Sequence, residues 1–285
     1  MAVARRLGHR RKLPIVSFFH DWSSTWLPAP RWVKHLVDRQ IRRLYCESRV
    51  SLPVSPTLRH RLGPHSAAWT LPPIPDEGSL PAPSCAAPFH IAYAGVFHLL
   101  YRAEIEALAV ALHEANEATL FRVFGPRLPT YGPLAAGTPV AGRIYGGYLG
   151  RDELSAALAG ASALLVVSPF AENWREIARF SFPSKIPEYC RFGKPILLWG
   201  PPDAASVEWA NRTGAALVVS DPRPEAVVAA IHRLRDDTEL RARLGAAAAR
   251  CADTMFHPRR LQGLFESALL YSLGRAPRPP REEIE

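Results

Sequence analysis

The stretch that decides the fold reads RFSFPSKIPEYCRFGKPILLWG and spans Arg179–Gly200. Ser184 is suited to cap a helix, and Pro187 then falls in the first turn, where a missing N–H costs little. Gly193 supplies a left-handed stop, and the apolar run that follows it predicts a buried strand. A helix that leads directly into a buried strand is the repeating unit of a parallel α/β sheet.

The same alternation of apolar runs and amphipathic helices extends through most of the chain. We predict strands at 89–94, 120–124, 163–167, 195–199 and 215–219. Residues 144–149 are expected to form a short strand or a turn. Helices are expected at 103–115, 152–159, 185–192, 225–234 and 238–251. Strands that are apolar throughout and separated by helices indicate a parallel sheet covered on both faces, as in a Rossmann-like domain.

The first 70 residues predict less structure. Strands are expected at 14–19 and 50–54, with a third candidate at 67–71, and one helix is expected at 33–45. So small a sheet buries too little surface to offset its ordering entropy, so we expect a partial domain. The stretch 71–88 holds six prolines and no apolar period, which is typical of a linker.

These patterns predict five segments along the chain. They are a partial N-terminal α/β domain at 1–70, a Pro-rich linker at 71–87, a C-terminal Rossmann-like domain at 88–252, a helix at 253–273 that packs back toward the N-terminal part, and a disordered tail at 274–285.

Charge is concentrated at one end of the chain. Of the net charge of +9, residues 1–86 carry 13 Lys and Arg against 5 Asp and Glu, whereas residues 87–285 carry 22 against 21. This asymmetry predicts an anionic partner, such as a lipid surface, a phosphorylated acceptor or nucleic acid. Nucleic acid ranks third, because no helix-turn-helix, zinc-finger or RNP pattern accompanies the charge.

Several classes of protein are disfavoured by what the sequence lacks. Apolar runs fall far short of the roughly 20 residues of a membrane span, and the basic start has no signal-peptide cleavage site, so we expect a cytoplasmic protein, peripheral at most to the inner membrane face. Cys46, Cys85, Cys190 and Cys251 stand apart from one another, which favours reduced structural thiols. There is no P-loop, nucleophile elbow or zinc-protease motif, and no Asp-x-Asp pair that would hold a metal on a diphosphate. We predict neither a metal nor a cofactor.

The helix start near Ser184 is the strongest candidate site. Exposed backbone amides, the positive end of the helix dipole and the Lys185 ammonium together suit a diphosphate. Glu188, one turn deeper, could bind ribose hydroxyls. Gly95 ends the strand at 89–94 and would let a phosphate approach the backbone, while Arg102 could neutralise its charge. The alternative is that Lys185 and Glu188 form an ordinary solvated pair and that Gly95 is only a turn residue.

Taken together, these motifs resemble the donor-binding half of GT-B glycosyltransferases of family 4, particularly bacterial surface-polysaccharide enzymes. The resemblance rests on the strand that ends at Gly95, on IYGGYLGRDEL at 144–154, on the strand that leads to Ser168, and on FPSKIPEYCRFGKPI at 182–196. It covers about residues 88–270 in order and implies a GT-B fold with a partial N-terminal domain.

The resemblance implies retaining transfer of a sugar from a nucleoside diphosphate to a lipid-linked or polysaccharide acceptor. By position it places the diphosphate on Gly95, Arg102, Ser184 and Lys185, the ribose on Glu188, and the base near Tyr148 and Leu149. The strand that ends in FFHD at 18–21 resembles the one that carries the family's cleft-facing histidine, so His20 is the candidate catalytic residue. Without the resemblance, a capping or core role would be the favoured reading of His20.

The sequence departs from the family pattern in two places. Phe180 stands where the first glutamate of the family's Glu-x7-Glu motif falls, and Glu172 and Glu176 are candidate substitutes. The family's N-terminal domain also has several strands before the histidine-bearing one, so we expect this sequence to be truncated, misassigned at its start or completed by a partner. A non-catalytic protein that binds nucleotide sugars therefore stays open as the alternative.

Overall fold

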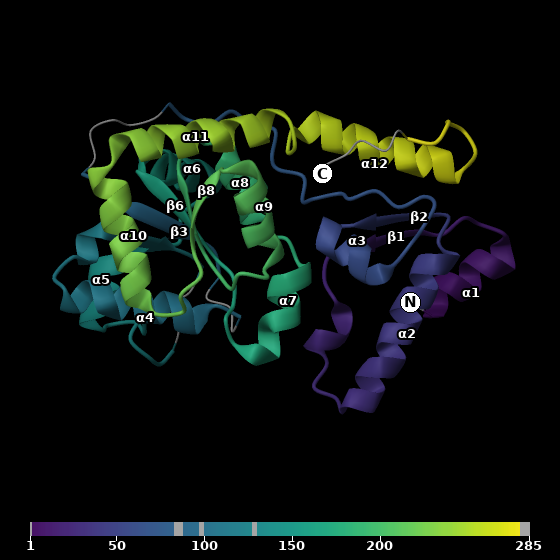
Figure 1. Ribbon diagram of the computed structural model, residues 1–285, viewed down its shortest axis with the longest axis horizontal. Helices are drawn as coiled ribbons and strands as arrows, with labels where there is room; N and C mark the ends of the chain where they lie inside the picture. The colour runs from purple at the N-terminus through teal and green to yellow at the C-terminus, as the bar shows by residue number, and fades with distance from the viewer. Residues whose placement is uncertain (1, 83–87, 97–99, 127–129, 280–285) are drawn as a thin grey trace.

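The protein folds into two parallel sheets, as the computed structural model of residues 2–82, 88–96, 100–126 and 130–279 shows (Figure 1). Cys85 and the end of the predicted tail lie outside the described residues. The smaller sheet pairs β1 (Val16–Phe19) with β2 (Val50–Pro53), and the larger has the strand order β5-β4-β3-β6-β7-β8. The prediction of an α/β protein with parallel strands is confirmed.

The six strands of the larger sheet are short and mostly buried. They are β3 (Ile91–Ala94), β4 (Phe121–Phe124), β5 (Tyr145–Gly147), β6 (Ala163–Val167), β7 (Ile196–Trp199) and β8 (Ala216–Val219). Each lies within two residues of its predicted position. All strand pairs are parallel, so every strand ends at the same edge of the sheet. Loops at this edge are where α/β sheets bind ligands.

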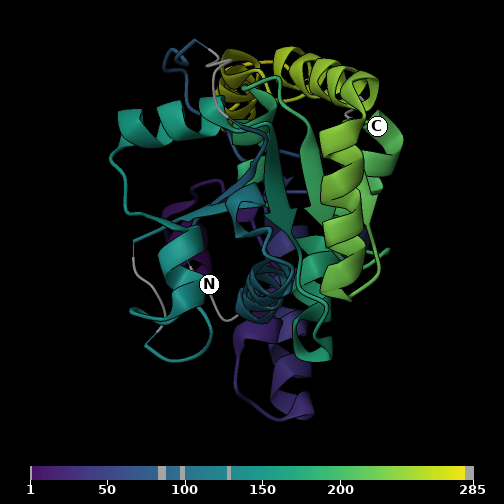
Figure 2. The ribbon, with the colours of Figure 1, turned by 90° about the vertical axis from the view of Figure 1, so that its left-hand side faces the viewer.

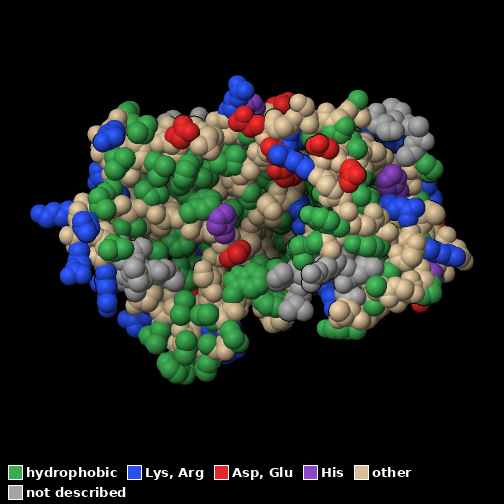
Figure 3. All heavy atoms as spheres, turned by 180° about the vertical axis from the view of Figure 1, so that it is seen from behind, with side chains coloured by type: hydrophobic (Ala, Val, Ile, Leu, Met, Phe, Trp, Pro, Cys, Tyr) green, Lys and Arg blue, Asp and Glu red, His purple; other side chains and the backbone are tan. Residues whose placement is uncertain are grey.

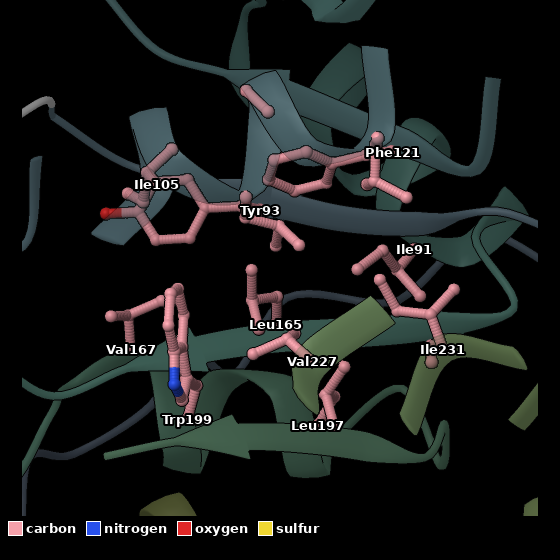
Figure 4. Close-up of a cluster of buried hydrophobic side chains, with 14 of the residues drawn as sticks. Ile91, Tyr93, Ile105, Phe121, Leu165, Val167, Leu197, Trp199, Val227 and Ile231 are labelled. Carbon is pink, nitrogen blue, oxygen red and sulfur yellow. The ribbon is translucent and has the colours of Figure 1, made fainter. Parts of the chain in front are cut away.

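Helices cover both faces of the larger sheet (Figure 2). One face carries α4 (Arg102–Glu114), α5 (Pro139–Ile144) and α10 (Pro224–Asp236), which pack on the buried cluster around Tyr93, Phe121 and Trp199 (Figure 4). The other face carries α6 (Arg151–Gly160), α8 (Lys185–Cys190) and α9 (Ala205–Thr213). Residues of α11 (Thr238–Asp253) contribute to both clusters.

The smaller sheet lies beside the larger one and has its own helices. These are α1 (Ala2–Arg11), the 3₁₀ turn η1 (Ser23–Trp26), α2 (Arg31–Glu47) and α3 (Pro56–Leu62). The candidate strand at 67–71 pairs with β2 in part. Ser51 donates to Ala67, Trp69 donates to Ser51 and Leu71 donates to Pro53, but only one regular bridge forms, between Ser51 and Ala68. The helix α1 was not predicted, because its basic residues mask any apolar period.

Four further elements connect the two sheets or extend the larger one. They are η2 (Ala118–Leu120), η3 (Glu172–Trp174) with α7 (Arg175–Phe180), and α12 (Pro258–Ser272). The C-terminal helix α12 packs Leu261 and Ala268 against Val50 and Leu52 of the smaller sheet. The chain thus returns to its N-terminal part at its end. The predicted domain boundaries remain a proposed division.

Two helical glycines provide a matched test of the packing. A Cβ added at Gly245 in α11 would lie 2.5 Å from the carbonyl oxygen of Gly193, whereas one added at Gly263 in α12 would meet nothing within 4 Å. We expect Gly245→Ala to lower the free energy of unfolding by about 1–3 kcal/mol through overpacking. Gly263→Ala should raise it by about 0.4–1 kcal/mol through helix propensity and chain entropy. Urea unfolding of both variants checks this, and equal effects would contradict the packing.

Candidate functional site

Gly95 and Lys185 meet at the carboxyl end of β3. Gly95 has a φ of +154°, and a Cβ there would lie 2.8 Å from both Cε and Nζ of Lys185. Any side chain at this position would therefore displace the lysine. The predicted proximity of a backbone turn and the Lys185 ammonium is present in the structure.

The Lys185 ammonium lies against aromatic rings. Its Nζ is 5.1 Å from the ring centroid of Tyr93 and 5.4 Å from that of Tyr101. Within the described ranges, no carboxylate pairs with this lysine. Its positive charge is thus held in place without being neutralised, and an anion can use it.

The backbone at the start of α8 contributes less than predicted. Ser184 is the N-cap residue, but its backbone is helical and its side chain caps no amide, so the prediction of a Ser184 cap hydrogen bond is wrong. The Ile186 amide donates to the carbonyl oxygen of Pro183 at 3.0 Å, and Pro187 has no N–H. Fewer free amides than predicted are therefore left beside the Lys185 ammonium at this helix start.

Glu188 is bound to the Pro-rich linker. The backbone N–H of Asp76 donates to Glu188 Oε1 at 2.7 Å, and Arg191 Nη1 lies 3.1 Å from Oε2. Arg191 also donates to the carbonyl oxygen of Gly78, and Arg151 pairs with the Asp76 carboxylate. The side chain of Glu188 is still 39% exposed, so it remains open to solvent on one side. It is not an ordinary solvated partner of Lys185.

The linker contact was missed by the sequence analysis. Its one local signal is the run Asp76-Glu-Gly78, a turn in which the Gly78 amide donates to Asp76 Oδ1 at 3.2 Å. A turn signal indicates where the chain bends and says nothing about which helix it contacts.

Arg102 is not joined to Gly95. Its Nε donates to Glu106 Oε1 at 3.1 Å, its guanidinium also donates to the carbonyl oxygen of Tyr131, and it lies 4.3 Å from the Tyr131 ring centroid. A phosphate would have to compete with Glu106 for this cation. The predicted role of Arg102 remains a prediction.

Tyr148 and Leu149 follow β5 at the same edge of the sheet as Gly95. Hydrogen bonds link the ends of the neighbouring strands β3, β4 and β5. The Gly95 amide donates to the carbonyl oxygen of Phe124 at 2.9 Å, and the Gly125 amide donates to the carbonyl oxygen of Gly147 at 3.1 Å. Tyr148 is 73% exposed and Leu149 is half-buried. An exposed aromatic ring at this edge is available to stack on a planar group.

The end of β1 reaches the segment that precedes α8. Ser181 Oγ donates to the Asp21 carboxylate, and Ser55 Oγ donates to the carbonyl oxygen of Phe180 at 2.6 Å. His20, beside Asp21, is exposed and meets the Phe18 ring edge-on, with centroids 4.1 Å apart. The structure therefore joins the carboxyl ends of β1 and β2 to the segment that leads into α8.

Phe180, which replaces the first glutamate of the Glu-x7-Glu motif, and the two candidate substitutes Glu172 and Glu176 all contact other residues of the protein. Phe180 is 8% exposed and packs on Trp22, with ring centroids 6.1 Å apart. Glu176 accepts a hydrogen bond from Thr25 at 3.0 Å, while Glu172 lies 3.7 Å from Arg175 at the surface. The Glu176 carboxylate is thus bound to Thr25 of the N-terminal part. This contact gives no support to Glu176 as a substitute for the missing glutamate.

A groove opens between α3 of the N-terminal part and α7 and α9 of the C-terminal part. Its volume is about 1450 Å³, and Arg59, His60, Arg212 and Glu208 are among the residues that line it. The groove is large enough for a second ligand, and its lining carries both signs of charge, because Glu176 and Asp203 lie beside Arg61 and Arg179.

Burial keeps two groups next to the site neutral. Burial raises the pKa of Tyr189, whose hydroxyl accepts a hydrogen bond from the Ala94 amide at 3.0 Å. Burial also raises the pKa of the Cys190 thiol well above its usual value. Among the described residues, no cluster of three His, Cys, Asp or Glu side chains could hold a metal ion.

Comparisons with known proteins show the fold. No protein-family model matches the chain, and no curated protein resembles it significantly in sequence. Sucrose-phosphate synthase from Thermosynechococcus elongatus has a similar structure, with a TM-score of 0.65 and 15% identity over 93% of this chain and 69% of that one. HepE from Anabaena, in complex with UDP-glucose, is similar with a TM-score of 0.67 and 14% identity; the match covers 95% of this chain and 76% of HepE. WaaG, a glycosyltransferase involved in lipopolysaccharide biosynthesis, is similar with a TM-score of 0.61 and 14% identity; the match covers 90% of this chain and 79% of WaaG. At this identity the likeness shows a GT-B fold, as the sequence predicts.

Proposed function

We propose that this chain is a retaining glycosyltransferase that transfers a sugar from a nucleoside diphosphate to a lipid-linked or polysaccharide acceptor without a metal ion. The observation that carries the proposal is the Lys185 ammonium, which lies beside Gly95 at the carboxyl end of a parallel strand and has no carboxylate partner among the described residues. The fold supports it, since the similar HepE structure contains UDP-glucose.

Each part of the donor would meet a different segment. The diphosphate would lie on Gly95, Ser184 and Lys185, with Arg102 in reach once it leaves Glu106. The ribose would bind Glu188, where its hydroxyls replace or share the Asp76 amide. The base would stack near Tyr148 and Leu149. Because a carboxylate oxygen accepts more than one hydrogen bond, Glu188 can hold both linker and ribose.

In the transfer step, the bond between the sugar's anomeric carbon and the diphosphate oxygen would break as a bond from that carbon to the acceptor's hydroxyl oxygen forms on the same face of the sugar, and the hydroxyl proton would pass to the leaving diphosphate. Negative charge then develops on the leaving diphosphate, and the Lys185 ammonium stabilises it more strongly than it stabilises the ground state. His20, in the N-terminal part, would lie near the transferred sugar. The groove between α3 and α9 would hold the acceptor.

Lys185→Ala tests the diphosphate site. Loss of a charge-assisted contact of about 1.5–3 kcal/mol should weaken UDP binding roughly 10- to 100-fold. Calorimetry with UDP in the presence of EDTA measures this, and Lys34→Ala on α2 is the control that removes a lysine elsewhere. Binding that is unchanged in Lys185→Ala would refute the site, and loss of binding in EDTA would refute metal independence.

Glu188→Ala tests the ribose contact separately. We expect UDP to bind roughly 10- to 100-fold more weakly, because a hydrogen bond to a charged group, of about 1.5–3 kcal/mol, is lost. Inorganic pyrophosphate, which has no ribose, should bind as it does to the unmodified protein. An equal loss for both ligands would show instead that the substitution disturbs the whole helix start.

A non-catalytic nucleotide-sugar binding protein is the second candidate. It is favoured by Phe180, which buries a phenyl ring where the family has a glutamate. The two candidates differ in one assay: a transferase releases UDP from UDP-glucose when acceptor or water is present, whereas a binding protein only shows a raised melting temperature with the donor.

We also propose that the N-terminal part binds an anionic membrane surface. Exposed apolar side chains are concentrated there, namely Leu7, Leu13, Phe18, Trp26, Leu27, Trp32 and Leu36. Trp32 and Leu36 share one face of α2 with the exposed Arg39. Figure 3 shows hydrophobic and basic side chains gathered over this end of the molecule. A basic, apolar helix face is typical of peripheral membrane binding. No described helix is long and apolar enough to cross a bilayer.

Vesicle sedimentation tests the membrane proposal. Binding should be stronger to vesicles with anionic lipid than to neutral ones, because each Lys or Arg near an anionic surface contributes about 1 kcal/mol. The double variant Trp32→Ala, Leu36→Ala should lose roughly tenfold or more in partitioning through lost apolar burial. Leu270→Ala, which removes another exposed leucine on α12, is the control. Equal binding to neutral and anionic vesicles would contradict the proposal.

A further inference from the structure

Lys185 is held by a cage of two tyrosine rings from different segments. Tyr93 belongs to β3, Tyr101 directly precedes α4, and their ring centroids are 6.2 Å apart at 66°. The Lys185 Nζ lies within 6 Å of both centroids, which is the range of a cation–π contact. Gly95 lies next to the same nitrogen, so the cage closes around the ammonium where a phosphate would approach the backbone.

A free lysine side chain would serve an anion site poorly. Its flexible four-carbon stem has many accessible rotamers, so an ammonium that nothing holds spends much of its time elsewhere. A carboxylate partner would hold it but would also cancel its charge. An aromatic face attracts the cation through its quadrupole and leaves the net positive charge in place.

The tyrosines keep this property only while they are neutral. Tyr93 is 1% exposed, and in Figure 4 its hydroxyl points away from the centre of the buried cluster. Burial, and then the neighbouring Tyr101 and Tyr189, raise the pKa of Tyr93 well above its usual value. A negatively charged phenolate beside Lys185 would cancel the charge of the lysine, as a carboxylate partner would. A phenol that stays protonated therefore leaves the positive charge of Lys185 in place.

We infer that Tyr93 and Tyr101 are positioning residues whose ring faces hold the Lys185 ammonium over Gly95 before the donor diphosphate binds. The inference rests on the proposed function for its ligand, and on the described contacts alone for the cage. It assigns the role to the rings and none to the hydroxyl groups. The cage raises affinity by increasing the fraction of protein in which the ammonium is already in place.

Tyr101 is the better residue to substitute, because it is only partly buried whereas Tyr93 is part of the core. In Tyr101→Leu one of the two rings is lost, and UDP and inorganic pyrophosphate should both bind about 2- to 30-fold more weakly, the equivalent of one cation–π contact. Tyr101→Phe keeps the ring and should bind both ligands as the unmodified protein does. Tyr271→Leu is the control, because it removes a tyrosine that faces Arg49 at 5.4 Å, away from Gly95 and Lys185.

A second measurement reports the cage without any ligand. The chain has four lysines, Lys12, Lys34, Lys185 and Lys194, so selectively ¹³C-labelled lysine gives few signals, and Lys185→Arg identifies one of them. Ring currents should shift the Lys185 Hε protons upfield. The shift should persist in Tyr101→Phe and shrink in Tyr101→Leu.

The outcomes separate the cage from the proposed function. An unshifted Lys185 signal, or a Tyr101→Leu variant that binds UDP like the unmodified protein, overturns the inference while the diphosphate site stands. Weakened binding in Tyr101→Phe as well assigns the role to the hydroxyl and also overturns it. If the unmodified protein binds neither UDP nor pyrophosphate, the proposed function fails and the positioning role fails with it, even where the signal still shows ring contact.

Discussion

The arrangement of this molecule depends on a pair of hydrogen bonds at one short segment. Ser55, at the end of β2, donates to the carbonyl oxygen of Phe180, and Ser181 donates to Asp21 at the end of β1. Both strands of the small sheet are therefore joined, at their carboxyl ends, to the residues that lead into α8. While the two parts stay packed together, the Phe180 carbonyl needs the Ser55 donor, because a buried carbonyl without a partner carries the full cost of desolvation. The pair of hydrogen bonds also fixes the end of the strand that carries His20 to the segment that leads into α8.

The two charged residues of α8 illustrate how a fold can give neighbours opposite roles. Lys185 keeps its charge, because its contacts are aromatic faces, and it faces the end of a parallel strand. Glu188, less than one helical turn away, shares its charge with Arg191 and with the amide of Asp76. The first arrangement suits an incoming anion. The contacts of Glu188 attach the linker to the same short helix. A ligand that contacts both Lys185 and Glu188 would therefore also affect the linker that joins the two sheets.

The strands of the larger sheet could be predicted from sequence to within two residues, because they are apolar at nearly every position and most are separated by helices with a clear period. Elements without that contrast could not be predicted. The helix α1 is too basic to show an apolar face, and α3, α5, α7 and α9 are too short to show a clear period. The Ser184 cap was wrong because a good capping residue still needs an extended backbone, and Ser184 is helical.

The sequence by itself determined the fold class, the order of the strands along the chain and the residue types at their carboxyl ends. These follow from local pattern, since burial on two faces demands apolar strands and a close backbone approach demands glycine at position 95. Only the tertiary structure decided which partner each charged side chain found: Tyr93 and Tyr101 for Lys185, the linker for Glu188, and Glu106 with Tyr131 for Arg102. Most of these partners come from other segments of the chain, and their proximity depends on how separate elements pack, which no local pattern encodes.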